Sequence, residues 1–568
     1  MPLRPAARFG PIVPARPKLG FPARFRPNLP TRFRPRLPAR SRLGLPALLC
    51  GGIAAFPACA PAHQEACALI FSTNDMHGRL LPAEQSWSDG RPVGGSAALA
   101  AYVARERAAT PECPLFVVSG GDIMQGTPIS NFTDGRSTIE AMNGIGYDAV
   151  SIGNHEFDWG VDILVERVAD ADFAMLSANI YLKDTGRHPE WVRPWTIIER
   201  EGVRVGFVGA TTTSTPVVAR PSLVADFDFR PISDALDRYI PEVRAAGADF
   251  VVAVMHEGAF CVIGAEEDAG GAACEGPALD ALAATAKRFD YAVTGHTHSR
   301  VEAEVRGVPV IQSYANTTAY GLGRIDRSAE GAVSARHLGI RQVWADEIAP
   351  DPDVERLVAS YRAEIAALVD RVIVDLPEAL SAPRDGDFPL GRIVADAQRR
   401  ASGAEVALMN NGGIRRSLPA GPVTFADLFE LQPFNNMLVR HTMTGAQLLR
   451  TLEHSVRDGA VDLHASGITV RYDPAAPYGE RIRDVTFDDG SPLRPEGRYL
   501  VAANDFIATG GGGYTTFAEA ERIEPLDVAD LEALVAYLQA QPDPFPIPRA
   551  PRWIESPRSV RSATIMLP

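Results

Sequence analysis

The apolar run of ALIFSTNDMHG (residues 68–78) ends in a polar turn that carries Asp75 and His77, and this pattern decides the fold because it recurs along the chain. Amphipathic segments such as 95–109 and 277–288 separate several of the runs. Alternation of strand-like and helical segments predicts layers of α-helix and β-sheet. The other runs are LFVVSGGD (115–122), AVSIGNHE (149–156), VRVGFVGA (203–210), FVVAVMHE (250–257) and YAVTGHTH (291–298).

The rest of the chain predicts further antiparallel strands, a connecting helix and a second domain. Residues 301–328 alternate with short turns, which indicates antiparallel strands. A helix from 352 to about 371 has an apolar stripe on one face, and we interpret it as an interdomain connector. The Pro-rich tail beyond 543 is expected to be irregular. The second domain, 380–545, is expected to contain helices at 390–402 and 444–457, strands near 405–413 and 467–473, and a Gly-rich turn at 509–513.

Composition excludes several classes of protein. The chain has 568 residues, of which 46% are apolar and 22% charged, as is usual for globular proteins. It contains no run of about 18 apolar residues, so a polytopic membrane protein is excluded. The net charge is −14, but residues 1–45 hold eleven basic residues and no acid, which leaves −25 for the remainder. The chain without its basic N-terminal segment should therefore repel nucleic acid polymers. A small anionic substrate would need metal ions or arginine side chains at its binding site.

The first 62 residues resemble a targeting segment. Residues 1–42 alternate Pro and Arg and are expected to be disordered. The apolar stretch 43–60 is too short to span a membrane and is followed by Ala62, which completes an A-x-A pattern. We therefore predict a signal peptide and a periplasmic or secreted mature protein without a membrane span. A lipid anchor on Cys59 is the alternative, and the first forty residues are either a genuine extension or an over-called start.

Four cysteines remain after such a cleavage, an even number in an oxidising compartment. Cys67 and Cys113 each precede an apolar run that ends in Asp, so their sulfurs would lie side by side if those runs are neighbouring parallel strands. Cys261 and Cys274 would close a Gly/Ala-rich loop. The alternative is that all four are unpaired small residues.

Polar side chains that can bind a metal follow five of the apolar runs. Any one Asp after a strand is usually a turn residue or a helix cap. However, residues i and i+2 of an extended segment share a face, which aligns Asp75 with His77 and His296 with His298. Strand ends gather at one edge of an α/β sheet, where ligands bind. The candidates are Asp75, His77, Asp122, Asn154, His155, His256, His296 and His298.

The donor types indicate the metals. Carboxylate, imidazole and amide without thiolate suit Mn, Zn, Fe or Co better than a structural zinc. There are too many candidates for one ion, but they suit two divalent ions about 3.5–4 Å apart with a shared Asp.

The motifs NDMHG, GGD, GNHEFD, VMHEG and GHTH, in this order, resemble the calcineurin-like metallophosphoesterases. The second half resembles the 5′-nucleotidase C-terminal domain in NNGGIR (410–415), QPFNN (432–436), MTGAQLL (443–449), SGITVRYD (466–473) and NDFIATGGGGY (504–514). The resemblance covers roughly 68–530 and implies a four-layer α-β-β-α domain followed by a smaller mixed α+β domain that binds substrate. The implied boundaries are 1–62, 63–345, a helical linker or hinge at 346–379, 380–545 and a tail at 546–568.

The resemblance also implies roles for the strand-end residues. Asp122 would bridge two metal ions, and His155 would stabilise charge on the transferred phosphoryl group or the leaving oxygen. Asp158 would orient His155, although it could instead be a helix first-turn acid. The first ion would be held by Asp75, His77, Asp122 and His298, and the second by Asp122, Asn154, His256 and His296.

In the second domain, the resemblance implies that Asn410 and Arg415 lie on a substrate-binding turn, from which Arg415 would reach phosphate. It also implies that Phe434 and Phe506 stack on a nucleobase. Each Phe could instead be core packing, and Arg384 is a further candidate substrate arginine. Gly512 stands where the family often has an Asp that contacts ribose hydroxyls.

The expected function is a secreted 5′-nucleotidase that hydrolyses nucleoside 5′-monophosphates by in-line attack of a metal-bound hydroxide, and also UDP-sugars or 2′,3′-cyclic nucleotides. The alternatives are a cyclic-nucleotide phosphodiesterase, a thiosulfohydrolase, or a non-catalytic binding protein on the same fold. The sequence leaves open whether the protein is a monomer or a homodimer.

Overall fold

The structure is a computed structural model that describes residues 65–85, 87–261 and 274–556. The predicted signal peptide, with Cys59 and Ala62, lies outside these residues. Within the described part of the chain, every helix is too short or too polar to cross a lipid bilayer.

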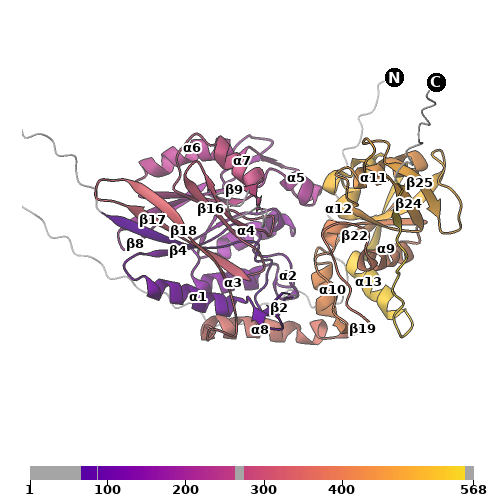
Figure 1. Ribbon diagram of the computed structural model, residues 1–568, viewed down its shortest axis with the longest axis horizontal. Coiled ribbons are helices and arrows are strands. Elements are labelled where there is room, and N and C mark those ends of the chain that lie inside the picture. The colour runs from indigo at the N-terminus through magenta and orange to yellow at the C-terminus, as the bar shows by residue number, and fades with distance from the viewer. Residues whose placement is uncertain (1–64, 86, 262–273, 557–568) are drawn as a thin grey trace, which may run out of the picture. The chain divides into compact units, whose positions relative to one another are not determined.

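The first domain is built on two six-stranded sheets (Figure 1). In the first sheet, four strands run parallel, and the antiparallel strand β17 pairs with β1 on one side and β18 on the other. The predicted runs at 68–75, 115–122 and 149–156 supply three of its strands. The order is β18 (Val333–Gln342), β17 (Ala319–Arg327), β1 (Ala66–Thr73), β4 (Leu115–Ser119), β5 (Ala149–Ser151) and β6 (Ala174–Leu176).

The second sheet has four parallel central strands with an antiparallel strand at each edge. The remaining three predicted runs form its strands β9, β11 and β14, and the antiparallel strands expected in 301–328 are present as β15, β16 and β17. The order is β15 (Arg300–Val305), β16 (Val308–Ser313), β14 (Tyr291–Val293), β11 (Phe250–His256), β9 (Val203–Thr211) and β8 (Trp195–Arg200).

Alternating side chains of each strand fill different cores, as the two-residue period of a strand requires. In β1, Ala68 and Ile70 face the second sheet and belong to the core between the sheets, with Val252 of β11. Leu69 and Phe71 face the helices on the outer side. The strands are buried on both faces, which explains why their sequences are continuously apolar.

Helices cover both outer faces and complete the four-layer α-β-β-α arrangement predicted from the sequence. The helices α6 (Ile232–Ala245) and α7 (Pro277–Ala284) pack on the second sheet, as Figure 1 shows on one side of the sandwich. On the first sheet lie α1 (Ser96–Ala109), α3 (Arg136–Ile145), α4 (Val161–Asp170) and α8 (Pro352–Val369).

The helix predicted from 352 is α8, and its start follows from its sequence. The Asp351 side chain accepts hydrogen bonds from the backbone N–H groups of Asp353 and Val354, with Pro352 in the first turn. Val354 and Tyr361 pack in the core of the first domain, whereas Leu368 packs against the core of the second. The apolar stripe of α8 thus contacts the cores of both domains.

The second domain is a mixed sheet with helices on both faces. The core on one face contains α9 (Pro389–Ser402), α10 (Phe425–Leu431) and α13 (Asp530–Gln539), and the core on the other contains α11 (Gly445–Ser455) and α12 (Asp505–Ala508). The five strands, in order, are β23 (Leu463–Ser466), β20 (Val406–Asn410), β26 (Arg498–Asn504), β22 (Met437–Thr444) and β27 (Arg522–Ala529).

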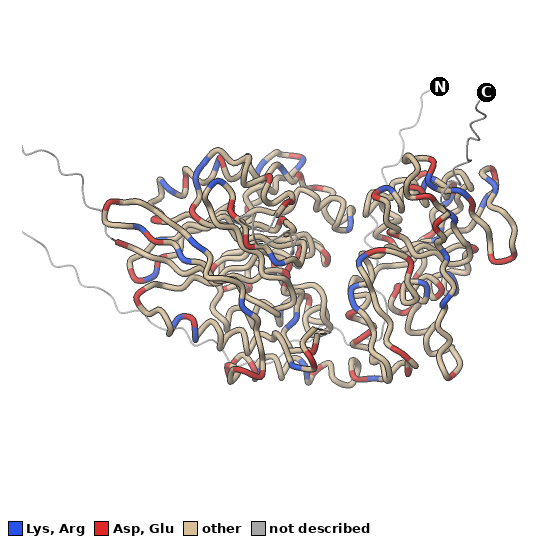
Figure 2. Tube along the Cα trace, viewed as in Figure 1, with Lys and Arg blue, Asp and Glu red and all other residues tan. Residues whose placement is uncertain are grey.

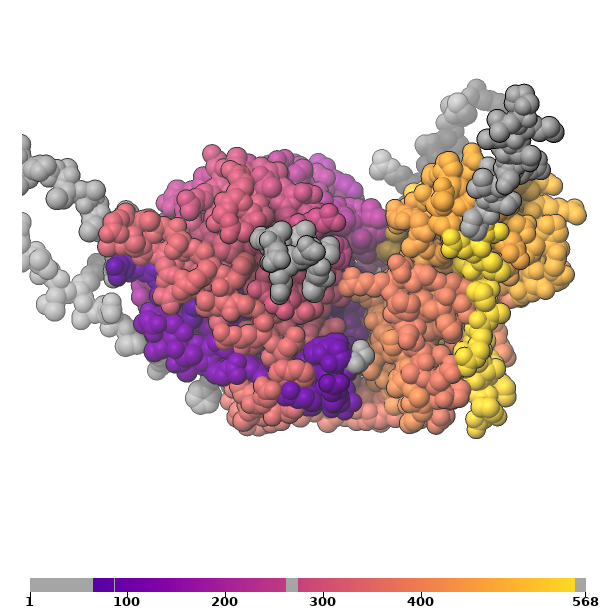
Figure 3. Space-filling model, in the orientation of Figure 1, coloured from indigo at the N-terminus to yellow at the C-terminus, as the bar shows by residue number. Residues whose placement is uncertain are grey.

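Two segments differ from the sequence-based expectation. The strand β19 (Val372–Leu376), inside the predicted linker, pairs with β21 (Gly421–Thr424) of the second domain. The tail predicted to be irregular contains β28 (Trp553–Glu555), which joins β24 (Ile468–Tyr472) and β25 (Ile482–Phe487) in a three-stranded sheet. The final described residues run over the surface of the second domain (Figure 3). A three-residue strand after many prolines has no periodicity that would reveal it.

All four cysteines of the described residues are paired, Cys67 with Cys113 and Cys261 with Cys274. The first bridge joins the start of β1 to the segment before β4, which confirms the expected proximity of their sulfurs. The second lies between the short strands β12 (Phe260–Cys261) and β13 (Cys274–Glu275). The alternative of four unpaired cysteines is wrong.

His441 should make the second domain acid-sensitive. This side chain of β22 is fully buried beside Phe517, and burial lowers its pKa from 6.5 to about 4. The folded pKa of His441 lies below its unfolded value. The part of the unfolding free energy that depends on neutral His441 is therefore fully present above pH 6.5 and is lost as the pH falls towards 4. The advantage of His441→Leu over the wild type in unfolding free energy should grow by about 2 kcal/mol between pH 7 and pH 5. Denaturant unfolding monitored at both pH values measures it, and a pH-independent difference would contradict it.

Candidate active site

The turns that follow five parallel strands meet at one edge of the two sheets. The backbone N–H groups of Asp75 and His77 donate to the carbonyl oxygens of Gly121 and Asp122, which joins the turns after β1 and β4. The N–H of His296 donates to the Asp75 carboxylate at 2.9 Å, which joins the first sheet to the turn after β14 in the second. The edge predicted from the sequence is therefore formed by both sheets together.

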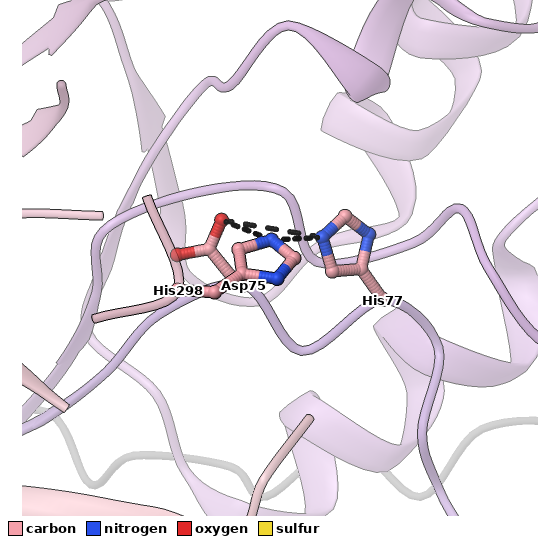
Figure 4. Close-up of side chains that lie close together, drawn as sticks. All are labelled: Asp75, His77 and His298. Carbon is pink, nitrogen blue, oxygen red and sulfur yellow. Dashed lines mark hydrogen bonds and ion pairs between the residues drawn. The ribbon is translucent and has the colours of Figure 1, made fainter. Parts of the chain in front are cut away.

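One cluster at this edge contains Asp75, His77 and His298, whose side chains point towards one another (Figure 4). The Nε2 atoms of the two histidines are 3.0 Å apart. Asp75 Oδ1 lies 3.4 Å from Nε2 of His298 and 4.0 Å from Nε2 of His77. Asp75 is fully buried, and His77 nearly so.

A second cluster contains Asp122, His256 and His296. His256 Nε2 is 3.1 Å from Asp122 Oδ2 and 3.2 Å from His296 Nδ1. Asn154 Oδ1 approaches the same His256 nitrogen at 3.0 Å. Six of the seven residues predicted as metal ligands therefore form these two clusters, and the seventh, Asn154, lies against the second.

The outer nitrogens of two imidazoles indicate where their protons lie. His77 Nδ1 donates to the carbonyl oxygen of Gln125, and His256 Nδ1 donates to that of Gly120, both at 2.8 Å. In the neutral imidazole with its proton on Nδ1, the Nε2 lone pair faces the cluster, which is the orientation that metal-binding histidines take. The carboxylate, imidazole and amide groups of the two clusters thus fit divalent cations as metal ligands, one cation in each cluster.

The backbone at these turns is strained. Residues other than glycine rarely have positive φ, and such positions concentrate at functional sites because they cost of order 1–3 kcal/mol each. Five of the seven candidate ligands have φ between 49° and 73°, namely Asp75, His77, Asp122, His296 and His298.

The electrostatics of the clusters favour ionised carboxylates. Burial opposes ionisation, but the neighbouring histidines outweigh it and lower the pKa of Asp75 to about 2. Burial likewise opposes ionisation of Asp122, but His256 and His155 hold its pKa well below its usual range. Two ionised carboxylates buried in neighbouring clusters need positive charge beside them.

His155 and Asp158 form a hydrogen-bonded pair beside the second cluster. They belong to the 3-10 turn η1 (His155–Phe157) and its C-cap, and Nδ1 of His155 donates to Oδ2 of Asp158 at 2.8 Å. Burial opposes protonation of the imidazole, but Asp158 and Asp122 outweigh it and raise the pKa of His155. The other ring nitrogen, Nε2, remains available to a bound molecule.

A cavity of about 310 Å³ connects these groups with the second domain. Asn410, Arg415, Phe434 and Phe506 all line it, together with Asp122, Asn154, His155 and Asp158. Phe434 stacks on the His155 ring with centroids 5.4 Å apart, and both Phe side chains are half-buried. Arg384 is not among the lining residues; it donates instead to the backbone carbonyl of Thr297 in the first domain, at 3.2 Å.

Sequence reasoning missed several residues of this region. Glu156 accepts hydrogen bonds from the backbone N–H groups of Asp122, Ile123 and Gly153 at 2.7–3.0 Å and so fixes two turns together. Two further arginines, Arg220 and Arg457, also line the cavity. The Glu in GNHE could have been noticed as a buried acid, whereas neither arginine belongs to a recognisable motif.

Several arginine side chains line the cavity, although the chain as a whole has a net negative charge. Figure 2 shows acidic and basic residues interspersed along both domains. In the cavity, however, three arginines from separate segments come together, Arg220, Arg415 and Arg457. Arg220 faces Asp505 at 3.7 Å and Arg457 is paired with Asp458 at 3.2 Å, so Arg415 is the guanidinium best placed to bind an anionic ligand.

Comparison with known proteins gives matches in both domains. Residues 69–300 match the calcineurin-like phosphoesterase family, and residues 372–519 match the 5′-nucleotidase C-terminal domain. The chain is 29% identical over 500 residues to endonuclease YhcR of Bacillus subtilis, covering 84% of this chain but only 40% of that protein. It is 29% identical over 512 residues to protein UshA of Yersinia enterocolitica, covering 83% of this chain and 90% of that one.

Solved structures agree with the two-domain fold. A 5′-nucleotidase precursor from Thermus thermophilus superposes with a TM-score of 0.73 at 26% identity, over 86% of this chain and 99% of that one. Sulfate thiohydrolase SoxB from the same species gives 0.68 at 20% identity, over 89% and 99%, which is a likeness of fold alone.

Glu156 should be important for the stability of the first domain. In Glu156→Gln, an NH2 group replaces one of the two acceptor oxygens. This NH2 group would face a backbone N–H inside the protein, and two donors cannot form a hydrogen bond with each other. We expect a loss of about 2 to 3 kcal/mol of unfolding free energy. Denaturant unfolding in EDTA measures the effect without any contribution from metal. Glu199→Gln, at a mostly exposed glutamate, is the control and should be neutral; equal stability of the two variants would contradict the role.

Proposed function

Since the chain belongs to the calcineurin-like metallophosphoesterases that carry a 5′-nucleotidase C-terminal domain, we propose that it hydrolyses nucleoside 5′-monophosphates to nucleoside and phosphate with two divalent metal ions. The observation that carries the proposal is the shared cavity. It places members of both donor clusters and His155 beside Arg415 and two half-buried aromatic rings.

The metal ligands follow from the donor clusters. Asp75, His77 and His298 would hold one ion, while Asn154, His256 and His296 would hold the other, with Asp122 contacting both. The mixture of carboxylate, imidazole and amide is suited to Mn, Zn, Co or Fe. Divalent ions at such a site polarise phosphate oxygens and make water a stronger nucleophile at neutral pH.

The chain's own groups have three tasks in this reaction. Arg415 would bind the phosphate with its guanidinium, and the Asn410 side chain lies in the same wall. His155 would stabilise negative charge through Nε2–H and donate this proton to the leaving ribose oxygen. Asp158 holds the opposite nitrogen and so fixes the ring orientation that this transfer needs.

The aromatic side chains support a nucleotide as substrate. Phe434 and Phe506 line the cavity and keep part of their surface exposed, whereas a purely structural Phe would be buried in a core. Stacking on any base is favourable because every base has a π-face. A flat substrate group beside a phosphate site is what this arrangement would select.

The enzyme would act outside the cytoplasm. Two disulfides in the described residues are typical of an oxidising compartment and agree with the predicted export. We also propose that residues around α8 and β19 form the hinge about which the domains move to admit substrate.

The proposal is tested by phosphate release from AMP, UDP-glucose, 2′,3′-cyclic AMP and bis(p-nitrophenyl) phosphate, with Mn²⁺, Zn²⁺ or EDTA. We expect metal-dependent release from AMP. His155→Ala should reduce kcat by about 10²- to 10⁴-fold, because proton transfer is lost, without changing metal content. Activity on the diester alone would overturn the assignment in favour of a phosphodiesterase. Failure of every substrate despite two bound ions would favour a non-nucleotide ligand or a binding protein.

The metal content of variants tests the ligand assignment. The wild type should retain two divalent ions per chain after gel filtration, as measured by atomic emission. Asp122→Asn should lose both because this carboxylate would contact both ions, whereas His77→Ala should lose only one. His337→Ala, at a histidine of β18 in the same domain, is the control and should retain two. A single ion in the wild type, or two ions in Asp122→Asn, would show that the assignment is wrong.

A further inference from the structure

One wall of the cavity has a carboxylate that the phosphate, metal and stacking roles do not use. It belongs to Asp462, which lies immediately before β23 and lines the cavity together with Tyr514, Gly512 and Phe506. Its backbone carbonyl accepts a hydrogen bond from the N–H of Asn411 at 2.8 Å. Asp462 therefore lies between the turn that carries Asn410 and the Gly-rich turn that follows Phe506.

The Asp462 carboxylate is held in a fixed orientation. The Tyr514 hydroxyl donates to its Oδ2 atom at 2.6 Å, and Tyr514 is almost completely buried. The Asp462 backbone is fixed as well, because its N–H donates to the Ser455 carbonyl at 3.0 Å. Among the described residues, the other oxygen, Oδ1, has no hydrogen-bond donor. A half-buried carboxylate that lines a cavity, with one oxygen occupied and the other without a donor among the described residues, can accept a hydrogen bond from a ligand.

The Gly-rich turn itself offers no side chain for this purpose. Gly512 has a φ of 65°, and a Cβ there would lie 3.2 Å from the Tyr514 ring. Its carbonyl oxygen is already occupied by His454 Nε2 at 2.9 Å. The acidic side chain beside Tyr514 in the cavity wall therefore comes from Asp462 and not from the Gly-rich turn.

The nearby cation does not neutralise Asp462 by direct contact. Arg457 also lines the cavity, but its Nε is paired with Asp458 at 3.2 Å, and its Nη1 donates to the His454 carbonyl. A ligand with a hydroxyl donor would therefore supply what Oδ1 lacks. Phe506 lies in the same wall, so such a hydroxyl would be carried by the group that joins a stacked base to the phosphate, namely the sugar.

We propose that Asp462 is a specificity-determining residue that accepts a hydrogen bond from the ribose hydroxyls of the substrate, in a chain whose Gly-rich turn cannot do so. The inference rests on the proposed nucleotidase function and names the sugar that the site selects. A site built to bind a substrate hydroxyl rejects the analogue that lacks it, because the buried acceptor is left unpaired. The enzyme should therefore prefer ribonucleotides to 2′-deoxyribonucleotides despite Gly512.

The test compares kcat/KM for AMP and dAMP in the metal-loaded enzyme and its variants. We expect the wild type to prefer AMP by about tenfold or more. Asp462→Asn should bring the ratio close to one through loss of AMP activity. Tyr514→Phe, which frees the carboxylate to rotate, should lower the ratio partially. Asp484→Asn, at an exposed acid on β25, is the matched control and should keep the wild-type ratio.

A second readout does not depend on turnover. Binding of adenosine and 2′-deoxyadenosine by calorimetry should show the same preference in the wild type and its loss in Asp462→Asn. Equal AMP and dAMP activities in the wild type, or a ratio that Asp462→Asn leaves unchanged, would overturn the role of Asp462 but not the nucleotidase. A change of base preference instead of sugar preference would also overturn it. Hydrolysis of p-nitrophenyl phosphate but of neither nucleotide would overturn the nucleotidase and the inference together.

Discussion

The arrangement of this protein depends on buried carboxylate, imidazole and amide groups that converge at one edge of the two sheets. His77 and His298 bring two Nε2 atoms to 3.0 Å, and His256 Nε2 faces both Asp122 and Asn154. Buried ionised carboxylates placed this way need positive charge beside them, which protonated histidines or bound cations supply. The fold must therefore supply rigidity that the cluster alone would not have.

The rigidity comes from the backbone around the cluster. Left-handed turns aim the side chains of Asp75, Asp122 and His298 inward, and each turn is tied to another by backbone hydrogen bonds. Glu156 binds three N–H groups from two turns, and the Asp75 carboxylate accepts the N–H of His296 across the sheets. Strain at a site persists only where the surroundings fix it this fully. The two-sheet sandwich thus serves to hold turns from both sheets at one edge.

The sequence predicts this edge well because strand ends and ligand chemistry coincide there. Apolar runs that end in Asp or His fix both the strands and the ligand candidates, and Asp351-Pro352 marks the start of α8. It predicts less where contacts join distant segments of low periodicity, such as β28 with β24, or β19 inside the expected linker. Arg220, Arg457 and Asp462 reach the cavity only through tertiary packing, and no spacing along the chain connects them.

This division has a physical basis that bears on specificity. The metal-binding turns are constrained by strand pairing and by donor geometry, so their residues must recur in recognisable motifs. The second-domain wall of the cavity includes residues outside regular strands, and its carboxylate comes from the position before β23 rather than from the Gly-rich turn. Loops tolerate such exchange because each side chain needs only to reach the cavity, not to complete a ladder. The Gly-rich turn therefore fixes the backbone beside Phe506, while Asp462 supplies the acidic side chain of this part of the wall.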